Sequence, residues 1–349
     1  MSAMSSVSHH SPVQAEGKPK PMNNPERSRP KAGAGASSLL QDVKRVSFWA
    51  DHAAIIGLVA LVIVFTALNP VFLTVGNIQS ILIAASILIV LTIGQSFVIL
   101  SDGIDLSVAS TMTLGVIAFG MAYAQGAGLL VSMIAAIVAS TLVGVLNGVL
   151  IAKGKITDFI VTLGSLSVAS GLALVLSDGK PTSITSIELI NFSTHGFLIF
   201  GNPFIVAAVL AVVAHIVLFR TRFGTHLFAT GGSKEAAQAT GISTARIKIA
   251  VYTISGVLAG VAAILLIARV GAAEPAANTT FLLNSVAAVV LGGVSLTGGR
   301  GSVLGPIIGA LLLTVLTNGL TLMNVSQFYQ PLAVGVVVIL AALLSRFQK

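Results

Sequence analysis

The chain has 349 residues, of which 55% are hydrophobic and 9% are charged, and its mean hydropathy is +0.99. Soluble domains carry roughly 25% charged residues, so a water-soluble globular fold is excluded and most of the surface must face lipid. Cysteine is absent, which excludes disulfides, thiolate metal sites and thiol nucleophiles. The net charge of +8 does not indicate a nucleic-acid partner, because the basic residues lie in an N-terminal tail and in short loops.

The N-terminal residues 1–45 are rich in Ser, Pro, Lys and Arg and contain no apolar run. This composition predicts a disordered basic tail, followed by one transmembrane domain over residues 46–349. The tail lacks the apolar core of a signal peptide, so we expect no cleavage. The alternative role of the tail is a polybasic patch held against anionic lipid.

After the tail, about ten apolar segments approach or reach the length that crosses a hydrocarbon core of about 30 Å. They run Ala53 to Leu68, Ile78 to Leu100, Leu106 to Ala124, Gly128 to Ala152, Ile156 to Leu176, Pro203 to Phe219, Ile249 to Arg269, Leu282 to Leu296, Val303 to Met323 and Phe328 to Ser345. The eighth is short and predicts a broken or partly re-entrant helix. The expected fold class is therefore an all-α polytopic membrane bundle.

The distribution of basic residues predicts the orientation of this bundle, because cytoplasmic loops carry an excess of Lys and Arg. With the tail inside, all 19 Lys and Arg residues fall inside except Lys180 and Arg269. Both termini are therefore expected in the cytoplasm. Two connections are long: residues 177–202 are expected outside, and residues 220–248 are expected inside.

Several chemistries are missing from the sequence. It contains no phosphate-binding loop of the Walker type and no His-Glu-x-x-His metal spacing, and no hydrolytic triad can be argued. We therefore expect a chain that is not an enzyme and holds neither a metal nor a cofactor. The Gly299-Arg300-Gly301 run predicts a tight turn rather than a phosphate site.

Ionisable residues are scarce at the centres of the predicted spans, which argues against an ion-coupled carrier. Asp102 and Asp105 lie in the hairpin between the second and third spans, and Asp158 lies near the start of the fifth. Carboxylates at these places favour helix capping over a role in transport.

The long inside connection contains a predicted short helix. Ser233 is a good N-cap, residues 234–240 form helices adequately, and Gly241 is placed as a C-cap. A free helix of this length is marginal in water, so we expect it to dock onto a partner protein at the cytoplasmic face.

Several stretches resemble the membrane-spanning permease subunits of bacterial ABC importers for monosaccharides, of the ribose, xylose, arabinose and galactose type. The resemblance runs from about Asn69 to the C-terminus. The stretches that carry it are Gly103 to Val108, Glu235 to Gly241, Ser255 to Gly260, Ala287 to Ser302 and Asn318 to Leu320.

The resemblance implies a multi-pass permease of the bacterial cytoplasmic membrane that works by alternating access. It implies a second permease copy, ABC ATPase subunits that bind ATP and Mg²⁺ at the cytoplasmic face, and an extracytoplasmic sugar-binding protein. It also implies that the short helix couples the chain to the ATPase, through Ser233, Glu235, Ala236, Ala237 and Gly241.

A path for a neutral polyol should offer hydroxyl and amide partners rather than charges. The polar side chains within the predicted spans that meet this requirement are Gln95, Asn147, Thr162, Ser165, Asn284 and Asn318. Three alternative functions stay open. They are an ABC permease for a nucleoside, inositol or a branched-chain amino acid, an ion-coupled secondary carrier, and a non-transporting membrane scaffold.

Overall fold

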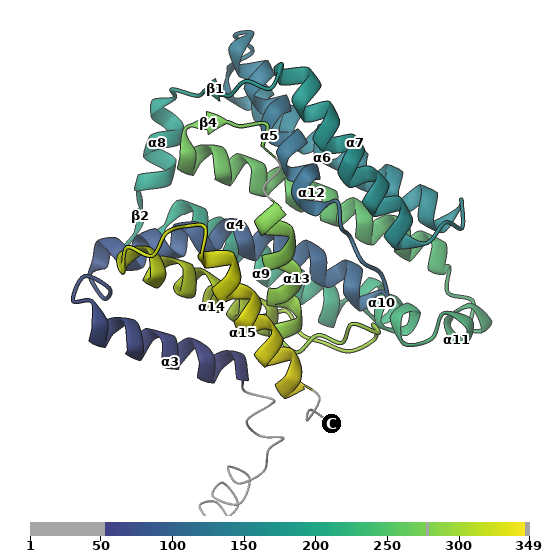
Figure 1. The fold of residues 1–349 in the computed structure, drawn as a ribbon. Helices are drawn as coiled ribbons and strands as arrows, with labels where there is room; N and C mark the ends of the chain where they lie inside the picture. The colour runs from purple at the N-terminus through teal and green to yellow at the C-terminus, as the bar shows by residue number, and fades with distance from the viewer. Residues whose placement is uncertain (1–52, 277–278, 346–349) are drawn as a thin grey trace, which may run out of the picture. The chain divides into compact units, whose positions relative to one another are not determined.

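The computed structural model describes residues 53–276 and 279–345 of the chain. The predicted basic tail over residues 1–45, and Arg346 and Lys349 at the other end, lie outside the described residues. Within the described residues helices dominate, and each of the four strands has only two residues (Figure 1). The predicted all-α membrane bundle is confirmed as a fold class.

Each of the ten predicted apolar segments corresponds to one apolar helix. These helices are α3 (Ala53–Leu68), α4 (Val75–Leu100), α5 (Val108–Ala124), α6 (Gly128–Ala152), α7 (Asp158–Ser177), α9 (Asn202–Arg220), α12 (Thr244–Val270), α13 (Thr279–Leu291), α14 (Leu304–Leu322) and α15 (Gln330–Ser345). The largest differences are at α12, which begins at Thr244 instead of Ile249, and at α13, which ends at Leu291 instead of Leu296. The length and apolar composition of the segments therefore located these helices.

By length and composition, six of these helices could cross a membrane: α4, α6, α7, α9, α12 and α14. The shorter ones are α3, α5, α13 and α15. Helix α13 has 13 residues, so at 1.5 Å per residue it extends about 20 Å, less than a hydrocarbon core. The predicted short eighth helix is confirmed, and irregular chain over residues 292–303 follows it.

Helix α4 lies between two groups of helices. One group contains α5, α6, α7 and α12, and the other contains α3, α13, α14 and α15 (Figure 1). Helix α4 contacts α12 on one side and α13 and α14 on the other. Every residue from Ala85 to Leu100 is buried, as expected for a helix that is apolar on all faces and lies inside a larger assembly.

The packing of α6 against α12 depends on glycine. A Cβ atom added at Gly144 would overlap the backbone oxygen of Tyr252, and one added at Gly256 would lie 2.6 Å from the backbone oxygen of Ser140. Small residues allow this approach where lipid supplies no hydrophobic force for helix association. These two glycines therefore set the close packing of α6 on α12.

Connections predicted on the same side of the membrane contact one another in the structure. Among the predicted inside connections, the N–H of Gly299 donates to the carbonyl of Leu100 over 3.0 Å. Among the predicted outside connections, β1 (Thr182–Ser183) pairs antiparallel with β4 (Ala272–Ala273). The number of crossings and the cytoplasmic position of the termini remain predictions.

The two long connections contain structure that hydropathy did not predict. The 177–202 connection contains β1, helix α8 (Ile187–Thr194) and a hairpin of β2 (Gly196–Phe197) with β3 (Phe200–Gly201). The 220–248 connection contains helix α10 (Arg222–Gly232) and then helix α11 (Lys234–Ala239). These helices are short and half-polar, so a search for apolar spans passes over them.

Replacing Gly144 with Ala should lower the free energy of unfolding by about 1–3 kcal/mol, because the added Cβ must push α6 away from α12. The measurement is the midpoint of thermal unfolding of the purified protein in detergent.

The matched control is Gly164→Ala on α7, where an added Cβ meets no atom within 4 Å. Since Ala favours a helix over Gly, this variant should unfold at the wild-type midpoint or above it. Equal midpoints for the two variants would contradict the close approach of α6 and α12.

Candidate functional site

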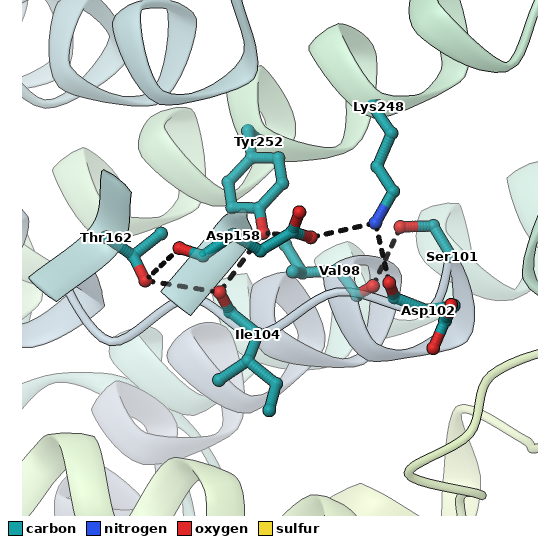
Figure 2. Close-up of polar contacts among 8 residues, drawn as sticks. All are labelled: Val98, Ser101, Asp102, Ile104, Asp158, Thr162, Lys248 and Tyr252. Carbon is teal, nitrogen blue, oxygen red and sulfur yellow. Dashed lines mark hydrogen bonds and ion pairs between the residues drawn. The ribbon is translucent and has the colours of Figure 1, made fainter. Parts of the chain in front are cut away.

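A polar cluster joins three elements at the predicted inside ends of the helices. Lys248 of α12 forms an ion pair of 2.8 Å with Asp158 of α7, and its Nζ also donates to the backbone oxygen of Asp102 over 2.7 Å (Figure 2). The hydroxyl of Tyr252 lies 2.9 Å from the same Asp158 oxygen and 3.1 Å from the carbonyl of Ile104. The Lys248 and Asp158 side chains are only 14% and 22% exposed, so this pair is shielded from water.

The neighbouring Asp105 carboxylate forms a second network. Its Oδ1 accepts hydrogen bonds from the N–H and the hydroxyl of Ser107, at 2.9 and 2.7 Å, and its Oδ2 accepts one of 2.8 Å from Ser255 on α12. Burial raises the pKa of Asp105 above its ordinary value, and these hydrogen bonds act in the opposite direction by stabilising the charged form. The carboxylate therefore connects the start of α5 to α12.

The capping role predicted for the three aspartates is correct only in part. Asp105 does accept the N–H of Ser107, the residue that precedes α5. Asp102 follows the end of α4 with a left-handed φ of 60° and caps no helix start. Asp158 is the first residue of α7, but its side chain binds Lys248 and Tyr252 instead of amides of its own helix.

Three of the predicted path residues belong to these networks. Asn147 donates to the Ser107 hydroxyl over 2.9 Å, and Ser165 donates to the Asn147 carbonyl oxygen. Thr162 donates to the backbone oxygens of Asp158 and Ile104. Since these groups are satisfied inside the α5–α6–α7 group, the geometry supports a packing role for them more strongly than the predicted path role.

The predicted short helix is present as α11. The Ser233 hydroxyl accepts the N–H of Ala236 over 3.2 Å, and Gly241 has a φ of 84°, so the N-cap and the terminating glycine are both confirmed. Within α11 only Ala237 is buried, and Glu235 and Ala236 are exposed. The described chain therefore supports this helix on one side and leaves the rest of its surface uncovered.

Helix α10 holds α11 against the bundle. Its start is capped by Thr221, which accepts the N–H of Gly224. Its end packs so closely on α4 that a Cβ added at Gly231 would overlap the carbonyl oxygen of Leu100. A Thr N-cap followed by apolar residues at Phe223 and Leu227 was the sequence signal that could have predicted this helix.

A cavity of about 430 Å³ separates α11 from the polar cluster. We name it the lysine cavity, because Lys155, Lys234 and Lys248 all line it. Asp102 and Asp158 also line it. Burial raises the pKa of Asp102, and the charge of Lys248 opposes that shift. Lys234 and Gln238 of α11 therefore line the same cavity as the ion pair of the polar cluster.

A second cavity, of about 590 Å³, lies at the predicted outside ends of α4, α12, α13, α14 and α15. We name it the amide cavity, and its polar lining consists of Arg269, Thr280, Asn284, Thr314, Thr317, Gln327 and Gln330. Among the described residues that line this cavity, Arg269 is the one charged group and there is no acid. Such a surface offers hydrogen bonds to a neutral solute.

The remaining predicted path residues lie in or near this second region. Asn284 lines the amide cavity. Asn318 on α14 forms a reciprocal amide pair with Asn77 on α4, at 3.0 and 3.1 Å. Gln95 is fully buried on α4, and neither its Nε2 nor its Oε1 has a hydrogen-bond partner within the described residues.

Replacing Lys248 with Met should destabilise the protein by about 1–3 kcal/mol, because Asp158 loses a charged partner in a shielded site. The measurement is again the midpoint of thermal unfolding. Arg246→Met is the matched control, since Arg246 lies on the same helix and is exposed. An equal shift for both variants would show that the ion pair contributes nothing specific.

Comparison with known proteins places the chain in a family of transport permeases. The family model described as "Branched-chain amino acid transport system / permease component" matches residues 77–344. The ribose import permease protein RbsC of Bacillus subtilis is 39% identical over 306 residues, which cover 83% of this chain and 91% of that protein. No solved structure gives a significant match.

Two further relatives carry the names of other sugars. The D-allose transport system permease protein AlsC of Escherichia coli is 33% identical over 86% of this chain and 92% of that protein. The L-arabinose ABC transporter permease protein AraH of Azospirillum brasilense is 34% identical over 80% of this chain and 83% of that protein. The chain therefore belongs to this family of multi-pass ABC transport permeases, together with the ribose, allose and arabinose permeases.

Proposed function

We propose that this chain forms the translocation path of an ATP-driven importer for a monosaccharide or a related polyol in the bacterial cytoplasmic membrane. The observation that carries the proposal is the amide cavity, whose lining contains three carboxamides and three threonine hydroxyls at Asn284, Gln327, Gln330, Thr280, Thr314 and Thr317. The Thr314 and Thr317 hydroxyls donate to carbonyls of their own helix and the Gln330 amide donates to Thr321, so these two hydroxyls are left to accept hydrogen bonds from a solute. Sugar hydroxyls need hydrogen-bond donors and acceptors and no counter-ion. The names of the relatives support the same solute class.

The family description also names branched-chain amino acids, and the cavity favours a sugar over such a solute. An amino acid carries both a carboxylate and an ammonium group, so a binding surface should offer it a cation and an anion. Arg269 would serve the carboxylate, but the lining of the amide cavity contains no acidic side chain for the ammonium group. A neutral polyol brings no ammonium group that would need an acid, and its hydroxyl oxygens can accept hydrogen bonds from the Arg269 guanidinium.

Helix α11 is the surface proposed to meet the ATPase. The ATPase subunit would contact the exposed residues Glu235 and Ala236, and also Ser233 and Gly241 at the ends of the helix. The buried Ala237 packs on the opposite side, against the rest of this chain. ATP is bound together with Mg²⁺ and hydrolysed on that partner, and this chain is the non-catalytic subunit. A second permease copy, and a sugar-binding protein at the 177–202 connection, complete the proposed assembly.

The proposal is tested by reconstituting the chain in liposomes with its ATPase and its sugar-binding protein. We expect uptake of a radiolabelled monosaccharide that requires ATP on the ATPase side and is unaffected by collapse of ion gradients. Uptake driven by an ion gradient without the ATPase would show an ion-coupled carrier instead. Uptake of leucine but of no sugar would show that the solute is an amino acid and not a monosaccharide.

Replacing Glu235 with Arg should abolish co-purification of the ATPase, because the change reverses the charge on the exposed face of α11 while leaving Ala237 in place. Thermal unfolding should stay at the wild-type midpoint, since Glu235 is exposed. Glu188→Arg is the matched control, because Glu188 lies on α8 within the predicted outside connection. An ATPase retained at wild-type yield by the Glu235 variant would rule out this surface.

A further inference from the structure

Two polar side chains on α4 are buried without partners. Both amide atoms of Gln95 and the hydroxyl oxygen of Thr92 lack a hydrogen bond within residues 53–276 and 279–345, and both side chains have an exposed fraction of zero. A buried donor or acceptor left unsatisfied loses its hydrogen bonds to water and gains nothing in return. Apolar side chains of similar size would stabilise this site, so packing does not explain Gln95 and Thr92.

The position of these residues on α4 relates them to the amide cavity. Ala84 and Leu88 of α4 line that cavity. At about 100° per residue, Gln95 lies within about 40° of both on the helix surface, and Thr92 borders the same face. At 1.5 Å per residue, Gln95 is about 10 Å beyond Leu88 toward the predicted inside end of the helix. The two unpaired side chains therefore continue the lining of the amide cavity beneath its floor.

The elements that close this region are short or irregular. Helix α13 packs against α4, lines the amide cavity at Asn284 and ends at Leu291. Residues 292–303 then form turns, and Gly299 bonds to Leu100 at the end of α4. A half-length helix followed by turns can shift against α4 with less loss of packing than a complete transmembrane helix.

We propose that Gln95 and Thr92 form an inner binding subsite for a neutral polyol, which is closed in this structure and opens when α13 and residues 292–303 move away from α4. Solute hydroxyls then supply the hydrogen bonds that the two side chains lack in the closed arrangement. The subsite lies between the amide cavity and the predicted inside end of α4. This inference rests on the proposed function, since it needs a solute that crosses the chain.

The test uses the complete reconstituted importer with Gln95→Met and Thr92→Val, two substitutions that keep side-chain size and remove hydrogen bonding. We expect each variant to lower the rate of sugar uptake about threefold to tenfold, the effect of one or two lost hydrogen bonds. The midpoint of thermal unfolding should stay at or above that of the wild type. Thr141→Val and Ser170→Ala are matched controls, since their hydroxyls on α6 and α7 are also buried and unpaired, and they should not change uptake.

A deoxy-sugar series gives a readout that a purely structural role would not move. If Gln95 forms a hydrogen bond to one hydroxyl of the solute, the wild type and Gln95→Met should take up the deoxy analogue that lacks this hydroxyl at the same rate. A lower unfolding midpoint with unchanged uptake per folded complex would overturn the subsite and assign Gln95 a structural role. A wild-type complex that imports no sugar would instead overturn the proposed function itself.

Discussion

The constraint on which this structure depends is that lipid offers no hydrogen bonds, so every polar group in the bundle must find its partner within the protein. The chain meets this requirement by grouping its polar side chains. Asp105 and Asn147 are satisfied in the network that joins α5, α6 and α12, and Asn77 pairs with Asn318 across α4 and α14. Gln95 is an exception, because both of its amide atoms lack a hydrogen-bond partner within the described residues. It lies on the face of α4 below the amide cavity.

The satisfied networks and the cavities divide the bundle into two parts with different roles. The α5–α6–α7–α12 group is held together by glycine contacts and by the polar cluster around Lys248. The amide cavity is lined mainly by α4, α13, α14 and α15, with Arg269 contributed by α12, and α13 is short and followed by irregular chain. Helix α11 is joined to α12 by the hydrogen bond from Gln238 to Thr244, and it faces the lysine cavity. In the proposed assembly, an ATPase bound at α11 would therefore act on the bundle through α12.

Apolar composition predicted the helices well, because a segment that crosses lipid must be continuous and apolar, and the caps at Ser233 and Gly241 predicted α11. Apolar composition did not predict α10, because the stability of this helix comes from packing on the end of α4. Polarity alone could not separate Asn284, which lines a cavity, from Asn147 and Thr162, which are bonded within the first group. That separation requires knowing which helix faces meet, and contacts between residues far apart in the sequence decide this.

If the proposed inner subsite exists, the face of α4 that carries Thr92 becomes part of the solute path during transport. The chain contains no cysteine, so the direct measurement is labelling of Thr92→Cys by a membrane-impermeant thiol reagent in the complex with its ATPase and binding protein. Ala84→Cys in the amide cavity and the buried Ser86→Cys serve as references. Thr92→Cys should be labelled during ATP turnover and protected at rest, whereas Ser86→Cys should never be labelled. A Thr92→Cys variant that stays unlabelled during turnover, while Ala84→Cys reacts, would contradict the proposed inner subsite.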